Sequence, residues 1–467
     1  MYQLIGDVCR YLAIVLMLFY TMICFTAFNR RSERSRSSVM NLQVMIMFLL
    51  HLVLNLSLYA VEQNIAHVFY YLVQVVFVIA TLLLYRTIYE GASRLIINNM
   101  CMLLVIGFAV LERLNFNESI RQFTIVTVSM LLSLLIPAMI ARWQFLRRIS
   151  WIYAIVGIVP LLVVLVRSRL VYGAKITLDL GFFSVQPSEF VKVVFVFFVA
   201  AILSKRPRFR TVVWTTVISA VYVVILVLST DLGAALLFFI TYLVMLYVGS
   251  GRAIYGLAGL AAGAGGGFVG AKLFPHVQNR ILAWKSPFEH YQDVGNQVSN
   301  SLIAIAVGGW FGVGLGRGYP TLVPLADKDF TFAAIAEELG GIFGICLILV
   351  YMSCFVMFIN ISVQIKHRFY KLVALGLSSM YGFQVFLTIG GAIKLIPSTG
   401  VTLPLISYGG SSILMMIILF AIIQGIYVLK LEEEEEDYAA IDQFTTEYEY
   451  PSGYDEYAQS DEDEETY

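Results

Sequence analysis

Three acidic residues near one apolar segment have the types and spacing needed for proton transfer. Asp329 precedes the apolar run 331–358, and Glu337 and Glu338 lie inside that run, about 12 Å deeper at 1.5 Å per helical residue. An aspartate at this place could simply cap a helix, but capping cannot explain two glutamates two turns further on. A carboxylate at a water interface, with further acids below it, suits a general base acting on a polar substrate at a membrane surface.

A second group of charged residues lies at the start of another apolar segment. Glu189 and Lys192 follow the helix-starting sequence Gln186-Pro187-Ser188, and the two charges are three residues apart on one helix face. They could form an ion pair that only orders the end of the helix. Because ionisable groups are costly inside a membrane, we also treat both residues as candidates for a functional site.

Further polar residues lie at the ends of other apolar segments. Asp231 lies in a turn-prone sequence between two of them, and Arg280, Lys285 and Lys394 are cations near the ends of others. Each could be an ordinary interfacial residue, but cations in regions otherwise poor in Lys and Arg suit anionic phosphates. The segment 397–412 gathers glycine, serine, threonine and proline. Such a segment either packs helices closely or builds a polar cavity lined by backbone.

These candidates must be held by membrane-spanning helices. Hydrophobic residues make up 59% of the 467 residues and charged residues 13%, which excludes an ordinary water-soluble domain. A helix needs about 20 mostly apolar residues to cross a bilayer. The sequence predicts thirteen such spans, near residues 8–28, 41–61, 67–85, 97–113, 122–141, 151–167, 188–204, 211–229, 232–250, 253–273, 331–358, 372–390 and 405–428. We therefore expect an all-α polytopic membrane protein.

The distribution of charge predicts how these spans are oriented. Lys and Arg cluster in every second loop, which places those loops in the cytoplasm, the N-terminus outside and the C-terminus inside. The only long loop, 274–330, then faces outward, and we expect it to be largely non-helical, with 301–315 as an interfacial or re-entrant segment. Residues 431–467 hold 16 of the 31 acidic residues and no Lys or Arg, so we expect a disordered cytoplasmic tail.

Several sequence blocks resemble one known family, the shape, elongation, division and sporulation (SEDS) proteins, which include RodA, FtsW and SpoVE. The blocks are Arg121-Gln122, Gly173-Ala174-Lys175, Leu178-Asp179-Leu180-Gly181, Gln186-Pro187-Ser188-Glu189 with Lys192, Asp231-Leu232-Gly233, Gln297 with Gly308-Gly309 to Gly316, Asp329-Phe330 with Glu337-Glu338-Leu339-Gly340, and Ser407-Tyr408-Gly409-Gly410-Ser411-Ser412. The resemblance covers about residues 97–430, a ten-span core. Residues 1–96, with three extra spans, and the tail 431–467 lie outside it. Ile176-Thr177 also replace an Arg-Trp pair that is frequent in the family.

The resemblance implies a peptidoglycan glycosyltransferase that joins lipid II units at the outer face of the bacterial cytoplasmic membrane. It implies a class B penicillin-binding protein as partner, with other division or elongation proteins, and Asp329 as the catalytic residue that deprotonates an acceptor sugar hydroxyl. The residues that we expect to bind substrate are Glu189, Lys192, Asp231, Arg280, Gln297, Glu337, Glu338, Lys394, Ser407 and Ser411.

Other functions stay open from the sequence. A lipid II flippase or transporter would also have many spans with buried charges, and a scaffold without catalysis would rely on the extra spans and the acidic tail. The shared blocks do not distinguish division, elongation and sporulation. No cluster of His and carboxylate residues has metal-ligand spacing, so no cofactor is evident, and the sequence leaves a divalent cation such as Mg or Mn open. A divalent cation could still bind through the pyrophosphate of the substrate. Nothing in the sequence indicates a nucleic-acid partner.

Overall fold

The computed structural model describes residues 2–29, 33–142, 144–167, 177–179, 184–205 and 208–448. The helices in these ranges are α1 (Tyr2–Asn29), α2 (Glu33–Glu62), α3 (Ile65–Ile88), α4 (Arg94–Leu114), α5 (Phe116–Ser133), α6 (Ile136–Arg142), η1 (Gln144–Arg147), α7 (Ser150–Arg167), α8 (Pro187–Leu203), α9 (Phe209–Leu228), α10 (Leu232–Ser250), α11 (Ala253–Leu273), α12 (Pro275–Lys285), α13 (Asn296–Gly308), η2 (Pro320–Leu322), α14 (Thr331–Gln364), α15 (Arg368–Ala392) and α16 (Gly410–Tyr448). Two short strands, β1 (Leu178–Asp179) and β2 (Ser184–Val185), pair antiparallel before α8, with Leu178 opposite Val185.

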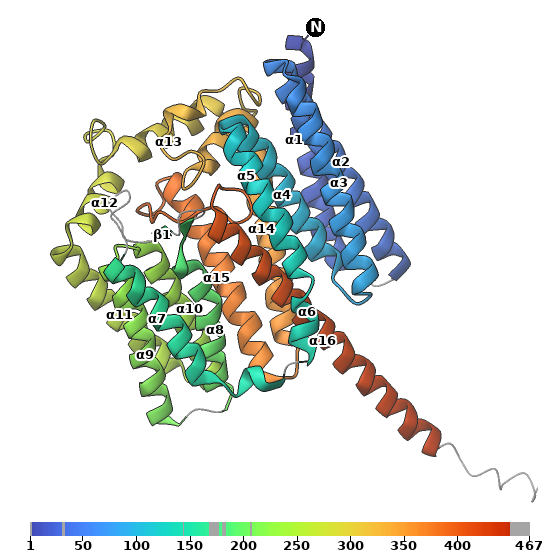
Figure 1. Ribbon diagram of the computed structural model, residues 1–467, viewed down its shortest axis with the longest axis vertical. Helices are drawn as coiled ribbons and strands as arrows, with labels where there is room; N and C mark the ends of the chain where they lie inside the picture. The colour runs from blue at the N-terminus through green and yellow to red at the C-terminus, as the bar shows by residue number, and fades with distance from the viewer. Residues whose placement is uncertain are drawn as a thin grey trace, which may run out of the picture.

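The helices agree with the predicted multi-pass membrane protein. Within the described ranges, twelve of them are long and apolar enough to cross a membrane. The thirteenth predicted span, 188–204, is α8, whose 17 residues reach the lower limit of about 17 for a spanning helix. The apolar stretch of α4 is wholly buried, whereas no residue of α11 is buried. The core therefore forms around α4 and α8, while α11 lies at the edge of the bundle (Figure 1).

The three N-terminal helices form a group of their own on one flank of the bundle (Figure 1). They pack against α4 and α14. Buried polar side chains join the two parts, because Tyr20 donates to Asn99 Oδ1 at 3.0 Å and Gln43 Nε2 donates to the same oxygen at 3.1 Å. Such bonds between helices are favoured in a membrane, where an unpaired polar group would face hydrocarbon.

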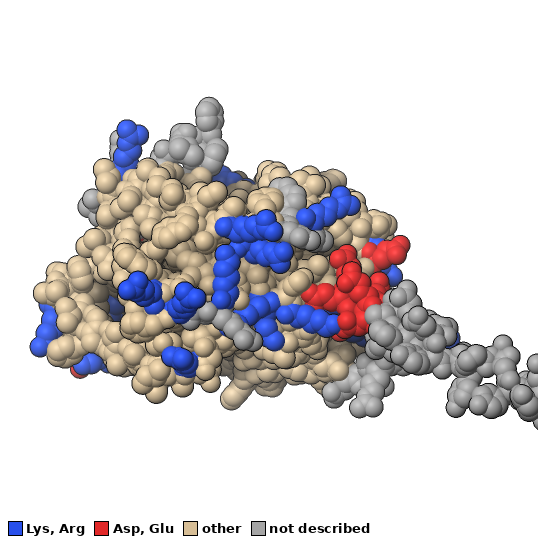
Figure 2. Space-filling view, turned by 90° about the horizontal axis from the view of Figure 1, so that it is seen from below, with Lys and Arg blue, Asp and Glu red and all other residues tan. Residues whose placement is uncertain are grey.

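The two ends of the bundle differ in structure and charge. One end carries α12 and α13, and we call it the α12–α13 end (Figure 1). At the opposite end, which carries η1, Lys and Arg side chains gather on the surface (Figure 2). The exposed residues of this basic surface include Arg147, Arg148, Lys205, Arg208 and Arg210.

Helix α14 is broken at Gly340, inside the predicted span 331–358. Gly340 has φ 91° and ψ 166°, a backbone conformation that few residues other than glycine adopt. The segment 309–314 replaces the lost helical bonds on both sides of the break. Gly341 N–H donates to Gly309 O at 2.8 Å, while Val313 N–H donates to Glu337 O at 2.9 Å. The break therefore separates a nine-residue half-helix, 331–339, from the longer spanning part.

The long loop 274–330 contains two helices, α12 and α13. The rest of the loop, apart from η2, is non-helical, as expected of a large non-helical region. Pro275 starts α12 at a position where a missing N–H costs nothing. Helix α13 is held to the end of α15 by Ser301, whose hydroxyl donates to Ala392 O at 2.7 Å. The predicted interfacial segment 301–315 corresponds to the second half of α13 and the segment that closes the α14 break.

The acidic tail also differs from its prediction. Helix α16 continues to Tyr448, so the expectation of disorder from residue 431 is wrong up to residue 448, and residues 449–467 lie outside the described residues. Glutamate is a good helix former, and a helix that is already nucleated in the membrane extends at little cost. Lys430 pairs with Glu434 at 3.1 Å, and Lys366 forms an ion pair with Asp437.

Candidate active site

Asp329 lies at the α12–α13 end of the bundle, two residues before α14. Phe330, not Asp329, is the N-cap residue of α14, and no side chain caps this helix. The capping role that the sequence left open for Asp329 is therefore not observed. Among the described residues, no group forms a hydrogen bond or a close ion pair with the Asp329 carboxylate. Its oxygen atoms are thus available to a substrate.

Arg280 lies next to this carboxylate. A Cβ atom on Gly400 would lie 3.4 Å from Arg280 Nη2 and 3.5 Å from Asp329 Oδ2, so the two side chains meet over the backbone of Gly400. Gly400 has φ 72°, which favours glycine, and its missing side chain leaves this space open. Arg280 Nη1 donates to Ser398 O at 2.8 Å, which anchors α12 on the segment 397–409.

The charges around Asp329 adjust its acidity. Burial raises the pKa of Asp329 to about 6, and the positive charges of Arg280 and Lys328 oppose this shift. The negative charges of Asp327 and Asp231 raise the pKa further. A carboxyl group with a pKa near 6 is mostly ionised at pH 7 and is still basic enough to accept a proton. Asp329 therefore has the properties of a general base.

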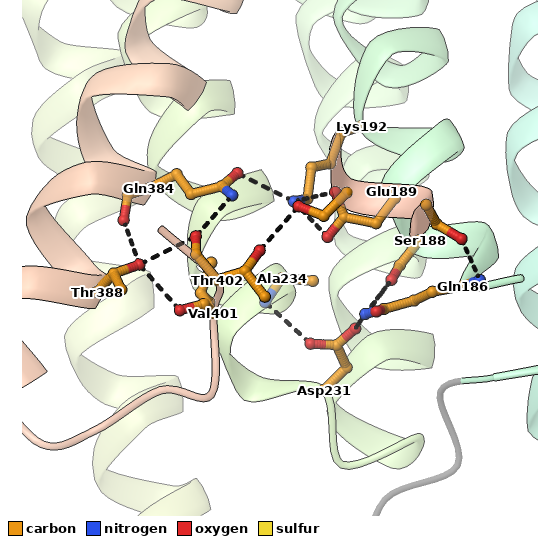
Figure 3. Close-up of polar contacts among 12 residues, drawn as sticks. Gln186, Ser188, Glu189, Lys192, Asp231, Ala234, Gln384, Thr388, Val401 and Thr402 are labelled. Carbon is orange, nitrogen blue, oxygen red and sulfur yellow. Dashed lines mark hydrogen bonds and ion pairs between the residues drawn. The ribbon is translucent and has the colours of Figure 1, made fainter. Parts of the chain in front are cut away.

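Asp231 joins the starts of two helices (Figure 3). Its Oδ1 caps α10 by accepting from Ala234 N–H at 3.1 Å. Its Oδ2 accepts from the Ser188 hydroxyl at 3.0 Å and from Gln186 Nε2 at 3.4 Å. Asp231 also attracts Arg280 electrostatically. The aspartate thus fixes the starts of α8 and α10, and its negative charge acts on Arg280.

Glu189 and Lys192 form a buried ion pair one turn inside α8 (Figure 3). Lys192 Nζ donates to both carboxylate oxygens of Glu189 at 2.8 Å and to Gln384 Oε1 at 3.1 Å. Gln384 Nε2 in turn donates to Thr402 O at 3.1 Å. The pair is therefore bonded within the protein and connects α8, α15 and the segment 397–409. Its charges are thus bound by protein groups, and their predicted contact with substrate stays a prediction.

The two serines of the last motif are also bonded within the protein. The Ser407 hydroxyl accepts from Leu403 N–H at 3.0 Å and lies 2.8 Å from the Thr331 hydroxyl. Ser411 Oγ accepts from Gln186 N–H at 3.0 Å. These bonds tie the starts of α14, α8 and α16 to one another. In this arrangement both serines shape the site, and their predicted contact with substrate stays a prediction.

Glu337 and Glu338 bind protein groups beside the α14 break. Glu338 Oε1 accepts from Arg113 Nε at 3.0 Å and from Gly318 N–H at 3.1 Å. Glu337 Oε1 accepts from Tyr319 N–H at 2.8 Å, while its Oε2 is buried and has no partner among the described groups. Both glutamates therefore hold the segment before η2, and neither is brought together with Asp329 by a hydrogen bond.

Two predicted residues lie at the margin of the site. The Lys394 backbone oxygen accepts from Trp284 Nε1 at 3.1 Å, which places Lys394 beside α12. Gln297 lies one turn before Ser301 on the face of α13 that contacts the end of α15. No hydrogen bond joins the side chain of either residue to the described part of the protein. The Gly173-Ala174-Lys175 block and Leu180-Gly181 lie outside the described residues.

Three further residues organise the site, and of these only Gln122 was named from the sequence, as part of the Arg121-Gln122 block. Gln384 bonds Lys192, Arg113 bonds Glu338, and Gln122 holds the last motif by donating to Ser407 O at 2.9 Å and accepting from Gly409 N–H at 2.9 Å. Gln384 could have been found as a strongly polar residue in the middle of the apolar run 372–390, where such residues are costly. Arg113 carried no such signal, because it ends its span as many interfacial cations do.

The described residues contain no group of three or more His, Cys, Asp or Glu side chains that could hold a metal ion. Asp231 and Asp329 are the carboxylates whose negative charges act on Arg280, and Arg280 already supplies a positive charge to both.

Comparison with known proteins agrees with this architecture. The family model of the cell cycle proteins FtsW, RodA and SpoVE matches residues 92–431. The peptidoglycan glycosyltransferase RodA of Mycobacterium tuberculosis is 37% identical over 270 residues, which cover 54% of this chain and 58% of that protein. Stage V sporulation protein E of Bacillus subtilis is 34% identical over 266 residues, covering 54% of this chain and 71% of that protein. The match thus spans little more than half the length of the mycobacterial relative.

Solved structures share the fold. One chain of a peptidoglycan synthase complex, in which polymerization and crosslinking are coordinated, aligns with a TM-score of 0.62 and 25% identity, covering 72% of this chain and 97% of that chain. The rod shape determining protein RodA of Thermus thermophilus aligns with a TM-score of 0.56 and 23% identity, covering 73% of this chain and 97% of that chain. Because the family model matches well over half of the chain, this protein belongs to the FtsW, RodA and SpoVE family of cell cycle proteins.

Proposed function

We propose that this protein polymerises lipid II into the glycan strands of peptidoglycan. The observation that carries the proposal is the Asp329 carboxylate, which accepts no hydrogen bond from the described residues, has a pKa raised to about 6 and lies beside the Arg280 cation. A free base next to a cation suits a reaction that removes a proton from a hydroxyl group and releases an anionic leaving group. The RodA and FtsW relatives are named peptidoglycan glycosyltransferases, which supports this reaction class.

The proposed reaction uses few protein groups. Asp329 takes the proton from a sugar hydroxyl of the acceptor, and the oxygen atom attacks the anomeric carbon of the growing strand. The bond from that carbon to undecaprenyl pyrophosphate breaks, and the pyrophosphate leaves with the electron pair. Arg280 is placed to stabilise negative charge that develops during this step. Any divalent cation would come bound to pyrophosphate oxygens, because the described residues offer no ligand cluster of their own.

We propose that the α12–α13 end faces outward and that the basic η1 end faces the cytoplasm. The gathering of Lys and Arg at the η1 end supports this orientation (Figure 2). Asp329 then lies on the side where the cell wall is built, with the N-terminus outside and the C-terminus in the cytoplasm. A tag placed after Asp461 should be reached by an impermeant label only after the membrane is opened. Labelling of the tag in intact cells would reverse the orientation.

A class B penicillin-binding protein is the proposed partner. The solved complex with the same fold coordinates polymerization with crosslinking, and the second activity must come from a protein other than the helical bundle. We expect the partner to raise the rate of polymerisation, because coordination requires the two activities to be coupled. Division, elongation or sporulation would then be decided by which partner binds.

A lipid II flippase is the second candidate, and the buried Glu189–Lys192 pair is the observation that favours it. The cavity beside this pair measures about 10 Å³, which is room for about one water molecule. A sugar headgroup could not pass there without a large rearrangement. A flippase should also tolerate a change of Asp329, which lies outside the spanning helices. A scaffold should tolerate loss of both sites.

The test uses the purified full-length protein with lipid II, with and without its cognate penicillin-binding protein. Removal of a general base costs about 10²- to 10⁴-fold in rate, so Asp329→Asn should make at least about 100-fold less polymer per minute. Glu289→Gln, which changes an exposed acid in the same long loop, is the matched control and should keep the wild-type rate. Equal rates for wild type and Asp329→Asn would rule out the assignment. Transport of lipid II across vesicles without polymer would favour the flippase.

A further inference from the structure

The position of Asp329 depends on a segment that precedes it in the chain. Asp329 lies two residues before the half-helix 331–339, which is separated from the rest of α14 by the break at Gly340. Across the break, the helical bonds are replaced by bonds to the segment 309–314. Glu338 also accepts from Gly318 N–H. The half-helix that follows Asp329 is therefore held in place by the segment 309–319, which we call the clamp segment.

Helices α1 and α2 hold the clamp segment from its other side. The Ser57 hydroxyl donates to Leu315 O at 3.2 Å. Arg317 Nη1 forms an ion pair with Asp7 at 2.5 Å, and Arg317 Nη2 donates to Gln3 O at 2.7 Å. The ring of Tyr11 also meets the ring of Phe311 edge-on, with centroids 5.9 Å apart. Three separate contacts thus fasten the clamp segment to the N-terminal helices.

Helix α3 reaches the same place by a second route. His67 lies between two carboxylates, 2.8 Å from Glu62 and 2.6 Å from Glu112. The residue after Glu112 is Arg113, which bonds Glu338 and also donates to Gly318 O at 3.0 Å. The end of α4 is therefore bonded to α3 on one side and to the clamp segment on the other.

The family match begins at residue 92, so α1–α3 lie outside the part that is shared with the relatives. We infer that these three helices are a positioning unit for the reaction centre. They hold the clamp segment, the clamp segment holds the half-helix 331–339, and the half-helix sets where Asp329 meets the acceptor hydroxyl. The catalytic part of this inference rests on the proposed polymerase function, whereas the mechanical part does not.

The Asp7–Arg317 pair is the best place to test the inference. Both side chains are partly exposed, with relative exposures of 52% and 28%, so the pair adds little to the stability of the fold. A change there can loosen the clamp segment without creating a cavity in the hydrophobic core. The Lys366–Asp437 pair, with exposures of 57% and 54%, is a matched control that joins the α14–α15 loop to α16 at the opposite end.

The test variants are Arg317→Glu, Asp7→Arg and the double variant that carries both changes. The control variants are Lys366→Glu and the double variant that carries Lys366→Glu and Asp437→Lys. Amide hydrogen exchange is measured in lipid nanodiscs, and polymerisation is measured with lipid II. Each single change at Asp7 or Arg317 should speed amide hydrogen exchange at Val313, Gly314, Gly341 and Ile342. It should also lower kcat by about tenfold to 100-fold with little change in KM, because misplacement of a catalytic group acts on the chemical step. The double exchange should restore both. The controls should leave both unchanged.

The two readouts separate the inference from the proposed function. Unchanged hydrogen exchange in the single variants would overturn the inference, whatever the enzyme does. Faster exchange with an unchanged kcat would overturn the claim that α1–α3 position the reaction centre. If exchange responds as expected but the wild type makes no polymer, the proposed polymerase function fails and the mechanical coupling stands.

Discussion

Two acidic regions lie eight residues apart in the chain and differ in what their carboxylates contact. Asp329 has no hydrogen-bond donor among the described residues and lies beside Arg280. Glu338, in contrast, accepts from Arg113 and from the backbone of Gly318. A carboxylate can take a proton from substrate only when its oxygen atoms are free, so the first region is suited to chemistry and the second to holding the fold. The sequence presents both regions as acids beside an apolar helix, and only the contacts separate them.

Replacing Arg280 should have the largest effect in this comparison. Arg280 lowers the pKa of Asp329, so Arg280→Gln should raise that pKa above about 6. Because the base must be ionised, the variant should lose activity at a higher pH than the wild type as the pH falls. Loss of the charge near the leaving group should also lower kcat/KM by about 100-fold at pH 7. The measurement is a pH profile of kcat/KM, with Arg280→Lys as a control that keeps the charge.

A wild-type profile that falls below about pH 6 and an Arg280→Gln profile that falls at the same pH would separate Arg280 from the titration of Asp329. Such a result would contradict the assignment of Asp329 as the catalytic base, because Asp329 would then not be the group whose titration the profile reports.

Replacing Glu338 should affect stability more than chemistry. Glu338→Gln removes the charge that pairs with Arg113, which is a partly buried cation with 21% exposure. We expect the free energy of unfolding to fall by about 1–3 kcal/mol, the cost of weakening a buried charged hydrogen bond. The rate per folded molecule should fall less than tenfold, and the acidic limb of the pH profile should not move. Thermal unfolding in detergent and a pH profile measure the two parts, and a shifted acidic limb would contradict the distinction.

Replacing Glu337 should have the smallest effect. Its Oε1 accepts from Tyr319 N–H, and its Oε2 is buried without a partner among the described groups. Glu337→Gln keeps the acceptor and removes a buried negative charge, so the free energy of unfolding should stay within about 1 kcal/mol of the wild type or rise slightly. Thermal unfolding beside Glu338→Gln gives the measurement. A loss as large as that of Glu338→Gln would show that the charge of Glu337 has a partner in the working protein.

Much of the fold was accessible from the sequence, because membrane spans are set by length and apolar composition. The break in α14 was not accessible, since Gly340 lies in a long apolar run and the segment that closes the break comes about 30 residues earlier. Asp329 was found from its place at the end of an apolar run. Its position beside Arg280 over Gly400 could not be found from the sequence, because it depends on three segments that meet only in the folded chain. Composition also misjudged residues 431–448, where helix propagation outweighed the repulsion of neighbouring glutamates.

The continuation of α16 beyond the bundle makes the acidic segment a spacer of defined length (Figure 1). Residues 431–448 form an uninterrupted helix, which reaches about 27 Å at 1.5 Å per residue. A protein that binds the chain after residue 448 would be held at about that distance from the basic surface. Each residue inserted into this helix would move it outward by about 1.5 Å and turn it by about 100°. Binding at this point would therefore depend on rotational phase as well as on charge.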